Sequence, residues 1–178
     1  MPREMRLVPY DVRWPRQFEA IRRELAEIFG PLALDIQPIG STAVPGMMAK
    51  PIIDVIVVVN DIGTVDSLDP AMRASGYLPR GESGIPGRRY FVMPTGDGEN
   101  HLRHIHCYEP DNPHVAAELL FRDTLRADSE AFRMYERVKL EAAERFRFSP
   151  GDYEAHKTAC VEAILNRARK KALPSGRL

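Results

Sequence analysis

The sequence contains only two cysteines among its 178 residues, Cys107 and Cys160. They lie far apart and lack the close pairing that is typical of zinc ligands. Neither a disulfide framework nor a cysteine metal site is therefore expected. We interpret both residues as free thiols in a reducing compartment.

No sign of charge prevails, because 25 basic residues balance 25 acidic residues. Such a chain has no overall field that would draw it to nucleic acid or to an anionic membrane. No apolar run reaches the roughly 18 residues that span a bilayer, and residues 1–11 lack the apolar segment of a signal peptide. We therefore expect a soluble cytoplasmic protein without a membrane or nucleic-acid partner.

The length and the composition, with 44% hydrophobic and 28% charged residues, are those of an ordinary globular domain. No internal repeat or low-complexity linker divides the chain. We expect a single α/β (α+β) domain over residues 1–178, with a mixed sheet, flanking helices and a helical part over about 113–172.

The first half of the chain alternates helical and strand patterns. Apolar residues recur at helical spacing from Trp14 to Phe29, and Gly30 would end that helix. The later patterns predict a strand over 32–40, a loop or single helical turn over 43–49, a strand over 50–59 that is apolar on both faces, and a helix over 66–75.

The second half predicts a β-hairpin followed by three helices. Residues 88–93 and 101–109 have strand patterns on either side of a Gly-rich connection, and residues 79–87 have the composition of a mobile surface loop. Helical patterns follow over 112–127, from about Asp128, and from Ser149, where Pro150 and Asp152 complete a start signature.

Asp54 is the only charged residue in the apolar part, residues 51–59, of the strand predicted over 50–59. A carboxylate among isoleucines is costly to ionise without a partner, because burial removes its hydration. Two interpretations stay open: Asp54 is a structural strut paired with a base or with backbone donors, or it binds a cation or substrate at the open end of the strand.

Gly40 and Ser41 follow the preceding strand and form a candidate phosphate turn. Backbone N–H groups and a hydroxyl at such a turn suit an anion. The alternative is that Gly40 only permits a tight turn and Ser41 caps the next one. The pair alone favours this structural interpretation.

The string Ile39–Val57, IGSTAVPGMMAKPIIDVIV, resembles the signature segment of the GrpB family within the nucleotidyltransferase-like superfamily. The resemblance continues through GIPGRRYF, HIH, LLFRDTLR and YERVKLEAA, and covers about Val8 to Arg169. That family also occurs as a domain fused to some dephospho-CoA kinases. The resemblance implies a nucleotidyltransferase-like mixed sheet with a helical C-terminal extension.

The resemblance also implies roles for particular residues. In active nucleotidyltransferases, a Gly-Ser pair backs the nucleotide phosphates, and two acidic residues two apart on the next strand hold divalent metal ions. Gly40, Ser41 and Asp54 match this pattern, whereas Ile56 occupies the second acidic position. Two-metal phosphoryl transfer needs several oxygen ligands, so this departure argues against the usual mechanism.

Two histidines offer a replacement for the missing acid. His104 and His106 fall on one face of the predicted hairpin strand. If that strand neighbours the Asp54 strand, Asp54, His104 and His106 would suit one transition-metal ion better than magnesium. The alternative is that both are half-buried histidines bonded to neighbours. The other three histidines, at positions 101, 114 and 156, receive no role.

Basic residues complete the candidate site. Lys50 directly precedes the Asp54 strand, and Arg89 follows a Gly- and Pro-rich loop that has the features of a lid. We expect both to contact phosphate, with surface ion pairs as the alternative. For Arg122, Arg126 and Lys157 the ion-pair interpretation is favoured.

These residues are compatible with two functions. The first is a nucleotidyltransferase-like protein that binds a nucleotide, such as ATP, or another phosphorylated small molecule beside the Gly40–Ser41 turn and Asp54. Asp54 would be catalytic, and a divalent metal ion would assist nucleotidyl or phosphoryl transfer. The alternative is a non-catalytic ligand-sensing or protein-interaction domain that lacks the second carboxylate.

Overall fold

The structure is a computed structural model that describes residues 6–98 and 100–172. Residues 1–5, Glu99 of the predicted Gly-rich connection, and residues 173–178 lie outside the described part. Within it, no helix combines the length and the apolar character that crossing a bilayer requires.

A five-stranded mixed sheet forms the centre of the molecule, with the strand order β1-β2-β5-β4-β3. The strands are β1 (Ala33–Ile39), β2 (Ile53–Val59), β3 (Leu78–Pro79), β4 (Arg89–Pro94) and β5 (His101–Tyr108). Only β2 and β5 pair in parallel, and the other neighbours are antiparallel. The predicted hairpin is therefore present as β4 and β5, and its second strand adjoins the Asp54 strand.

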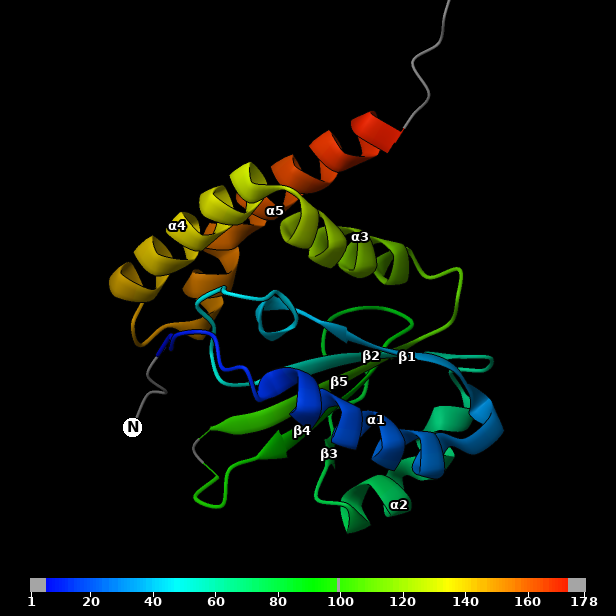
Figure 1. Cartoon of the computed structure of the whole chain (residues 1–178). Coiled ribbons are helices and arrows are strands. Elements are labelled where there is room, and N and C mark those ends of the chain that lie inside the picture. The colour runs from blue at the N-terminus through cyan, green and yellow to red at the C-terminus, as the bar shows by residue number, and fades with distance from the viewer. Residues whose placement is uncertain (1–5, 99, 173–178) are drawn as a thin grey trace, which may run out of the picture.

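One face of the sheet is covered by α1 (Trp14–Phe29) and α2 (Asp69–Ala74), as Figure 1 shows. The helix predicted over 66–75 begins later than expected. A 3₁₀ segment, Thr64–Leu68, comes first, and α2 starts at Asp69 with Pro70 in its first turn. Proline suits this position because its missing N–H has no helical partner there. The core on this face contains Trp14, Leu25, Val55 and Val57.

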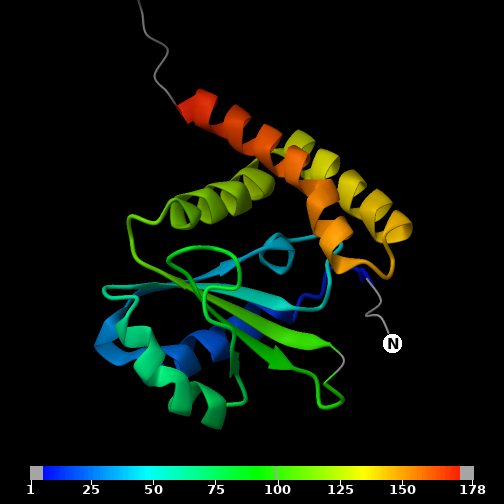
Figure 2. The same ribbon diagram turned by 180° about the vertical axis from the view of Figure 1, so that it is seen from behind.

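The opposite face is covered by α3 (Pro113–Ala127), α4 (Ser129–Arg145) and α5 (Pro150–Ala172). Both Figure 1 and Figure 2 show these three helices together on that side of the sheet. The predicted start near Asp128 is confirmed, because the Asp128 carboxylate accepts hydrogen bonds from the backbone N–H groups of Glu130 and Ala131. Val115 of α3 packs against Ile56 of β2.

The segment between β1 and β2 joins the sheet to the helices. It begins with a 3₁₀ turn, Ser41–Ala43, and continues as a loop over 44–49, so the loop alternative predicted for 43–49 is the one present. Val44 and Met47 are buried among side chains of α3, α4 and α5. Arg126 donates to the Ala43 carbonyl at 2.9 Å. The turn that was predicted to bind phosphate is thus held by the helical part.

Both predicted free thiols are present. Cys107 is buried in the sheet, and Cys160 is half-buried in α5. Burial raises the pKa of each thiol, so neither is poised as a thiolate nucleophile.

Candidate functional site

Gly40 lies against the carboxylate of Asp54. In the antiparallel β1–β2 pair, Ile39 is opposite Asp54, so the next residue reaches the end of the Asp54 side chain. Gly40 has φ +69° and ψ −170°, a region that is essentially limited to glycine. A Cβ there would lie 2.7 Å from Asp54 Oδ2. Only glycine therefore permits this close approach of backbone and carboxylate.

Asp54, His104 and His106 meet on the face of the sheet that α3, α4 and α5 cover. In the parallel β2–β5 pair, Asp54 is opposite His104 and Ile56 is opposite His106. Asp54 Oδ1 lies 2.9 Å from His104 Nδ1 and 4.0 Å from His106 Nε2. The three side chains are 26%, 15% and 19% exposed, so a small ligand can reach them. We call these three residues the Asp54 site.

The donor atoms of the Asp54 site fit one metal ion. One atom from each residue lies within 4.8 Å of the others. Four ligands around zinc at about 2.1 Å are about 3.4 Å apart, and the two distances given above bracket this value. Two imidazole nitrogens and one carboxylate oxygen suit a transition-metal ion.

His101 orients the ring of His104. His101 Nδ1 lies 2.8 Å from His104 Nε2, so the two nitrogens share a hydrogen bond while His104 Nδ1 faces Asp54. Partners of this kind on the far ring nitrogen commonly hold metal-binding histidines in place. The sequence offered no role for His101, because its spacing alone does not show which way its ring points.

Arg88 contacts the ring of His106 from the other side. Arg88 Nη1 lies 3.4 Å from His106 Nδ1. A guanidinium can only donate, so this contact favours a neutral ring with its proton on Nε2, toward Asp54. Arg88 also donates to the Glu82 and Ser83 carbonyls, and thereby holds the 80–88 loop over the sheet.

Burial and neighbouring charges set the protonation of the site. Although burial alone raises its pKa, the hydrogen bond from His104 and the charges of both site histidines and Lys50 hold the pKa of Asp54 below its usual range. Burial, with the charge of Arg88, lowers the pKa of His106 to about 4 despite the opposing effect of Asp54. At neutral pH the site therefore holds a carboxylate and a neutral His106.

Glu118 of α3 faces the same region. His114, one turn before it, stacks on Tyr108 of β5, and Arg122, one turn after it, donates to the Pro38 carbonyl of β1. Glu118 lies between these contacts and therefore above β2. Burial and the charge of Asp54 raise its pKa to about 7. A carboxyl that titrates at neutral pH beside Asp54 can accept or release a proton there.

Ser41 and Lys50 lie at the border between the sheet and the helices. Ser41 lies close enough to Tyr135 of α4 to oppose the rise in the pKa of that phenol. Lys50 Nζ lies 3.1 Å from Glu154 Oε1 in α5 and contributes to the low pKa of Asp54. The structure thus brings Gly40, Ser41 and Lys50 together with the Asp54 site.

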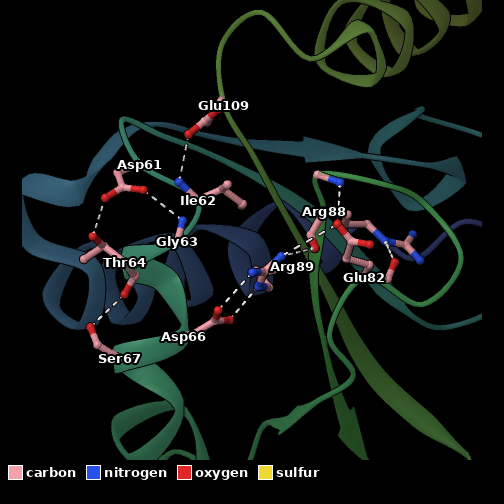
Figure 3. Close-up of polar contacts among 11 residues, drawn as sticks. Asp61, Ile62, Gly63, Thr64, Asp66, Ser67, Glu82, Arg88, Arg89 and Glu109 are labelled. Atoms are coloured by element: carbon pink, nitrogen blue, oxygen red, sulfur yellow. Dashed lines mark hydrogen bonds and ion pairs between the residues drawn. The ribbon is translucent and has the colours of Figure 1, made fainter.

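Arg89 does not join this group. It begins β4 opposite Cys107 and pairs with Asp66, with Nε 2.5 Å from Oδ1. Figure 3 shows the Arg89 guanidinium directed to Asp66, and its Nη1 also lies 4.0 Å from Glu82 Oε1. Adjacent residues of a strand point to opposite faces, so Arg88 rather than Arg89 lies beside His106 of the Asp54 site.

The other basic residues considered from the sequence contact groups of the protein itself. Arg122 is 8% exposed and donates to Gln37 Oε1 and the Pro38 carbonyl. Lys157 pairs with Glu154 at 2.8 Å. Asp123 pairs with Arg122 at 2.8 Å and with Arg126 at 3.7 Å. The favoured ion pairs are thus present, although Arg122 and Lys157 are buried and not on the surface. A separate groove of about 500 Å³ lies between α1 and β1, lined by Trp14 and Phe18 among others.

Lys139 is a buried residue that the sequence pattern did not single out. It is 1% exposed and donates to the Met48 carbonyl. Its position could have been found from α4, because Ala131, Tyr135, Lys139 and Ala142 form one buried stripe in which lysine is the exception.

Comparisons with known proteins place these features in a family. A model of the family described as "GrpB protein" matches residues 4–167. The UPF0157 protein YqkA of Bacillus subtilis is 36% identical over 168 residues, which are 94% of this chain and 48% of YqkA. The chain therefore spans about half the length of this relative. A dephospho-CoA kinase of Mycolicibacterium paratuberculosis is 34% identical over 85% of this chain and 42% of the kinase.

Solved structures agree with this placement. The conserved protein GrpB from Enterococcus faecalis has a TM-score of 0.86 and 34% identity, over 93% of this chain and 98% of that chain. Terminal uridylyl transferase 4 from Trypanosoma brucei, with bound dUTP, has a TM-score of 0.55 and 12% identity, over 90% of this chain and 56% of that chain. The second likeness confirms the nucleotidyltransferase-like fold alone. This chain belongs to the GrpB family.

Proposed function

We propose that this protein binds a nucleotide, such as ATP, or another phosphorylated small molecule between the Gly40–Ser41 turn and Asp54, and transfers a nucleotidyl or phosphoryl group. The observation that carries the proposal is the approach of Gly40 to Asp54, where a Cβ would lie 2.7 Å from Oδ2. A glycine that leaves its backbone open beside a carboxylate suits a phosphate bound next to a cation.

Asp54, His104 and His106 would hold the divalent ion. Such an ion supplies positive charge that polarises a phosphoryl oxygen. The fully buried Ile56 stands where a second carboxylate would be expected, so a single ion with nitrogen ligands is the form that these residues support. His101 would keep the ring of His104 in place, as it does in the free protein.

The remaining residues have roles that follow from their charge. Asp54 would also be the catalytic carboxylate, and Glu118 would accept the proton of an attacking hydroxyl, since its pKa is raised to about 7. Lys50 would contact phosphate, while Arg88 would supply the positive charge that was expected from Arg89.

A second function is a ligand-sensing or protein-interaction domain without catalysis. Its support is the contact of Arg88 with His106 Nδ1 at 3.4 Å. This contact favours the proton on Nε2, the nitrogen that a metal would need, and therefore opposes metal binding. In this case the Asp54 site would be a hydrogen-bonded cluster that keeps a ligand turn in shape.

Asp54→Asn separates the two functions. Calorimetry with Mn²⁺ and Zn²⁺, followed by a thermal-shift screen over nucleoside triphosphates, would show whether binding depends on this carboxylate. Stabilisation by a bound ligand follows from mass action and needs no knowledge of the reaction. We expect the variant to lose metal binding and turnover, whereas Asp111→Asn, at an exposed carboxylate before α3, would retain both.

Retention of metal and nucleotide binding by a folded Asp54→Asn variant would contradict the catalytic proposal. Nucleotide binding that needs neither a metal nor Asp54 would favour the sensing function.

A further inference from the structure

Three lysines from separate segments lie over two neighbouring tyrosines, two of them over Tyr153 and one over Tyr135. Lys50 precedes β2, Lys139 lies in α4 and Lys157 lies in α5. The Tyr153 ring centroid is 5.0 Å from Lys50 Nζ and 4.3 Å from Lys157 Nζ. Lys139 is buried with its Nζ 5.4 Å from the Tyr135 ring centroid, and the charges of Lys157 and Lys50 act on it. We call these three residues the lysine cluster.

One carboxylate bridges the two outer lysines. Glu154 Oε1 lies 3.1 Å from Lys50 Nζ, and Glu154 Oε2 lies 2.8 Å from Lys157 Nζ. The Glu154 side chain is 57% exposed, whereas those of Lys50 and Lys157 are 27% and 10% exposed. The carboxylate thus lies on the solvent side of the ammonium groups, with one oxygen on each, as two oxygens of a phosphate would.

The lysine cluster brings ammonium groups close enough to act on one another. Burial and the charges of Lys157 and Lys50 lower the pKa of Lys139 to about 7, against the opposing effects of Glu136 and Asp54. Buried ammonium groups are costly unless an anion compensates them, so the cluster requires a negative charge on its solvent side, which Glu154 supplies in the free protein.

The other nearby acids have their contacts elsewhere. Glu136 accepts a hydrogen bond from the Met48 N–H at 3.1 Å, Asp54 is bonded to His104, and the pKa of Glu118 is raised to about 7. Glu154 is therefore the only acid among these that contacts the outer lysines directly.

The lysine cluster continues from the Gly40–Ser41 turn. Ser41 lies beside Tyr135, which is one helical turn before Lys139 in α4. Asp54 lies within range of the charges of Lys50 and Lys139. A ligand with one phosphate at the turn could extend further phosphates toward the lysines without leaving this side of the sheet.

We propose that the lysine cluster binds the distal phosphates of a polyphosphate ligand, such as a nucleoside triphosphate, and that the Glu154 carboxylate occupies this position in the free protein until the ligand displaces it. The proposal rests on the proposed nucleotide site for the rest of the ligand. It adds a subsite that inorganic tripolyphosphate alone can test.

The experiment is calorimetric titration of the whole chain with tripolyphosphate, in EDTA to remove metal ions. Lys157→Met should weaken binding roughly tenfold or more, because a charge-assisted contact is lost. Glu154→Gln should strengthen binding roughly tenfold, because the competing carboxylate is removed. Glu162→Gln, at an exposed glutamate two turns further along α5, should leave the affinity unchanged.

A Glu154→Gln variant that binds tripolyphosphate equally well or more weakly would overturn the displacement, since a merely structural ion pair gives no gain on its removal. Unchanged affinity in Lys157→Met, or no binding by the natural chain, would overturn the subsite. If Lys157→Met fails to fold, the more exposed Lys50→Met provides the same test.

The outcomes separate this proposal from the proposed function. Tripolyphosphate binding with the expected variant effects, but without nucleotide binding, would retain the subsite and reject the nucleotide site. Nucleotide binding that depends on Asp54 but not on Lys50 or Lys157 would retain the nucleotide site and reject the subsite.

Discussion

Asp54 remains ionised in an apolar strand because its neighbours are placed to compensate the cost of burial. The hydrogen bond from His104 and the charges of His106 and Lys50 lower its pKa against the effect of desolvation. Gly40 completes the arrangement by leaving no side chain between the backbone and Oδ2. The structural and the functional interpretation of Asp54 are therefore compatible, since a residue paired in the free protein can also hold a ligand.

Gly40→Ala should destabilise the protein by about 2–4 kcal/mol, because both backbone strain and a close contact with Asp54 Oδ2 arise. Urea unfolding would measure this loss. Gly46→Ala is the matched control, since Gly46 also has a positive φ of +82° but no atom within 4 Å of the added Cβ. Equal losses in the two variants would contradict the role of the contact.

Arg88→Gln should raise the affinity for Mn²⁺ or Zn²⁺ by roughly tenfold, because a repelling charge is removed and His106 Nε2 is freed from its proton. Calorimetry in parallel with Arg89→Gln provides the control, since Arg89 pairs with Asp66 on the opposite face. Weaker metal binding by a folded Arg88→Gln variant would show that Arg88 supports the metal site.

At the scale of elements, α4 carries a lysine in the stripe that it buries. The ammonium group of Lys139 is satisfied by the Met48 carbonyl, so α4 is tied to the segment that leads into β2. This tie has an energetic cost, because burial lowers the pKa of Lys139 to about 7. A helix that only packed against its neighbours would carry an apolar residue here.

The stability of the protein should rise with pH as Lys139 loses its proton. The pKa of Lys139 is about 7 in the folded chain, whereas the ordinary pKa of lysine is 10.5. Between these two pH values the unfolded chain therefore binds more protons at this residue than the folded chain does. From pH 7 to pH 9 the free energy of unfolding of the natural chain should gain about 2 kcal/mol relative to Lys139→Met.

Urea unfolding of both proteins at the two pH values checks this, and Lys170→Met, at an exposed lysine of α5, is the control. A constant difference between the natural chain and Lys139→Met would refute the prediction.

At the scale of the whole molecule, the sheet lies between two helical layers that meet different cores. Trp14, the single tryptophan of the chain, is 4% exposed in the core beneath α1, while α3, α4 and α5 form a separate core around Tyr135. Val44 and Met47 insert from the sheet side into that helical core. These contacts couple the two parts.

We therefore expect one cooperative unfolding transition, as the prediction of a single domain over residues 1–178 requires. Trp14 fluorescence would report on the sheet core, and circular dichroism at a helical wavelength would report mainly on the five helices. The two urea curves should coincide. A separate early transition by circular dichroism would show that the helical part unfolds independently.

The sequence by itself determined the order of the helices and of the four longer strands, but not the short β3, and it indicated Asp54, His104 and His106 as candidate site residues. Hydrophobic periodicity is a local property, so it predicted the helices, the hairpin and the doubly covered Asp54 strand. It located the start of α2 less well, because a 3₁₀ turn and an α-helical turn share nearly the same pattern. Strand alternation also placed His104 and His106 on one face.

Only the tertiary structure decided which distant groups meet. A one-residue difference separates Arg88, which contacts His106, from Arg89, which pairs with Asp66 on the other face. The convergence of Lys50, Lys139 and Lys157 depends on how three segments pack, and no local pattern records this. Charges act through space over several ångströms, so the electrostatics of the site belong to the folded chain and not to the sequence alone.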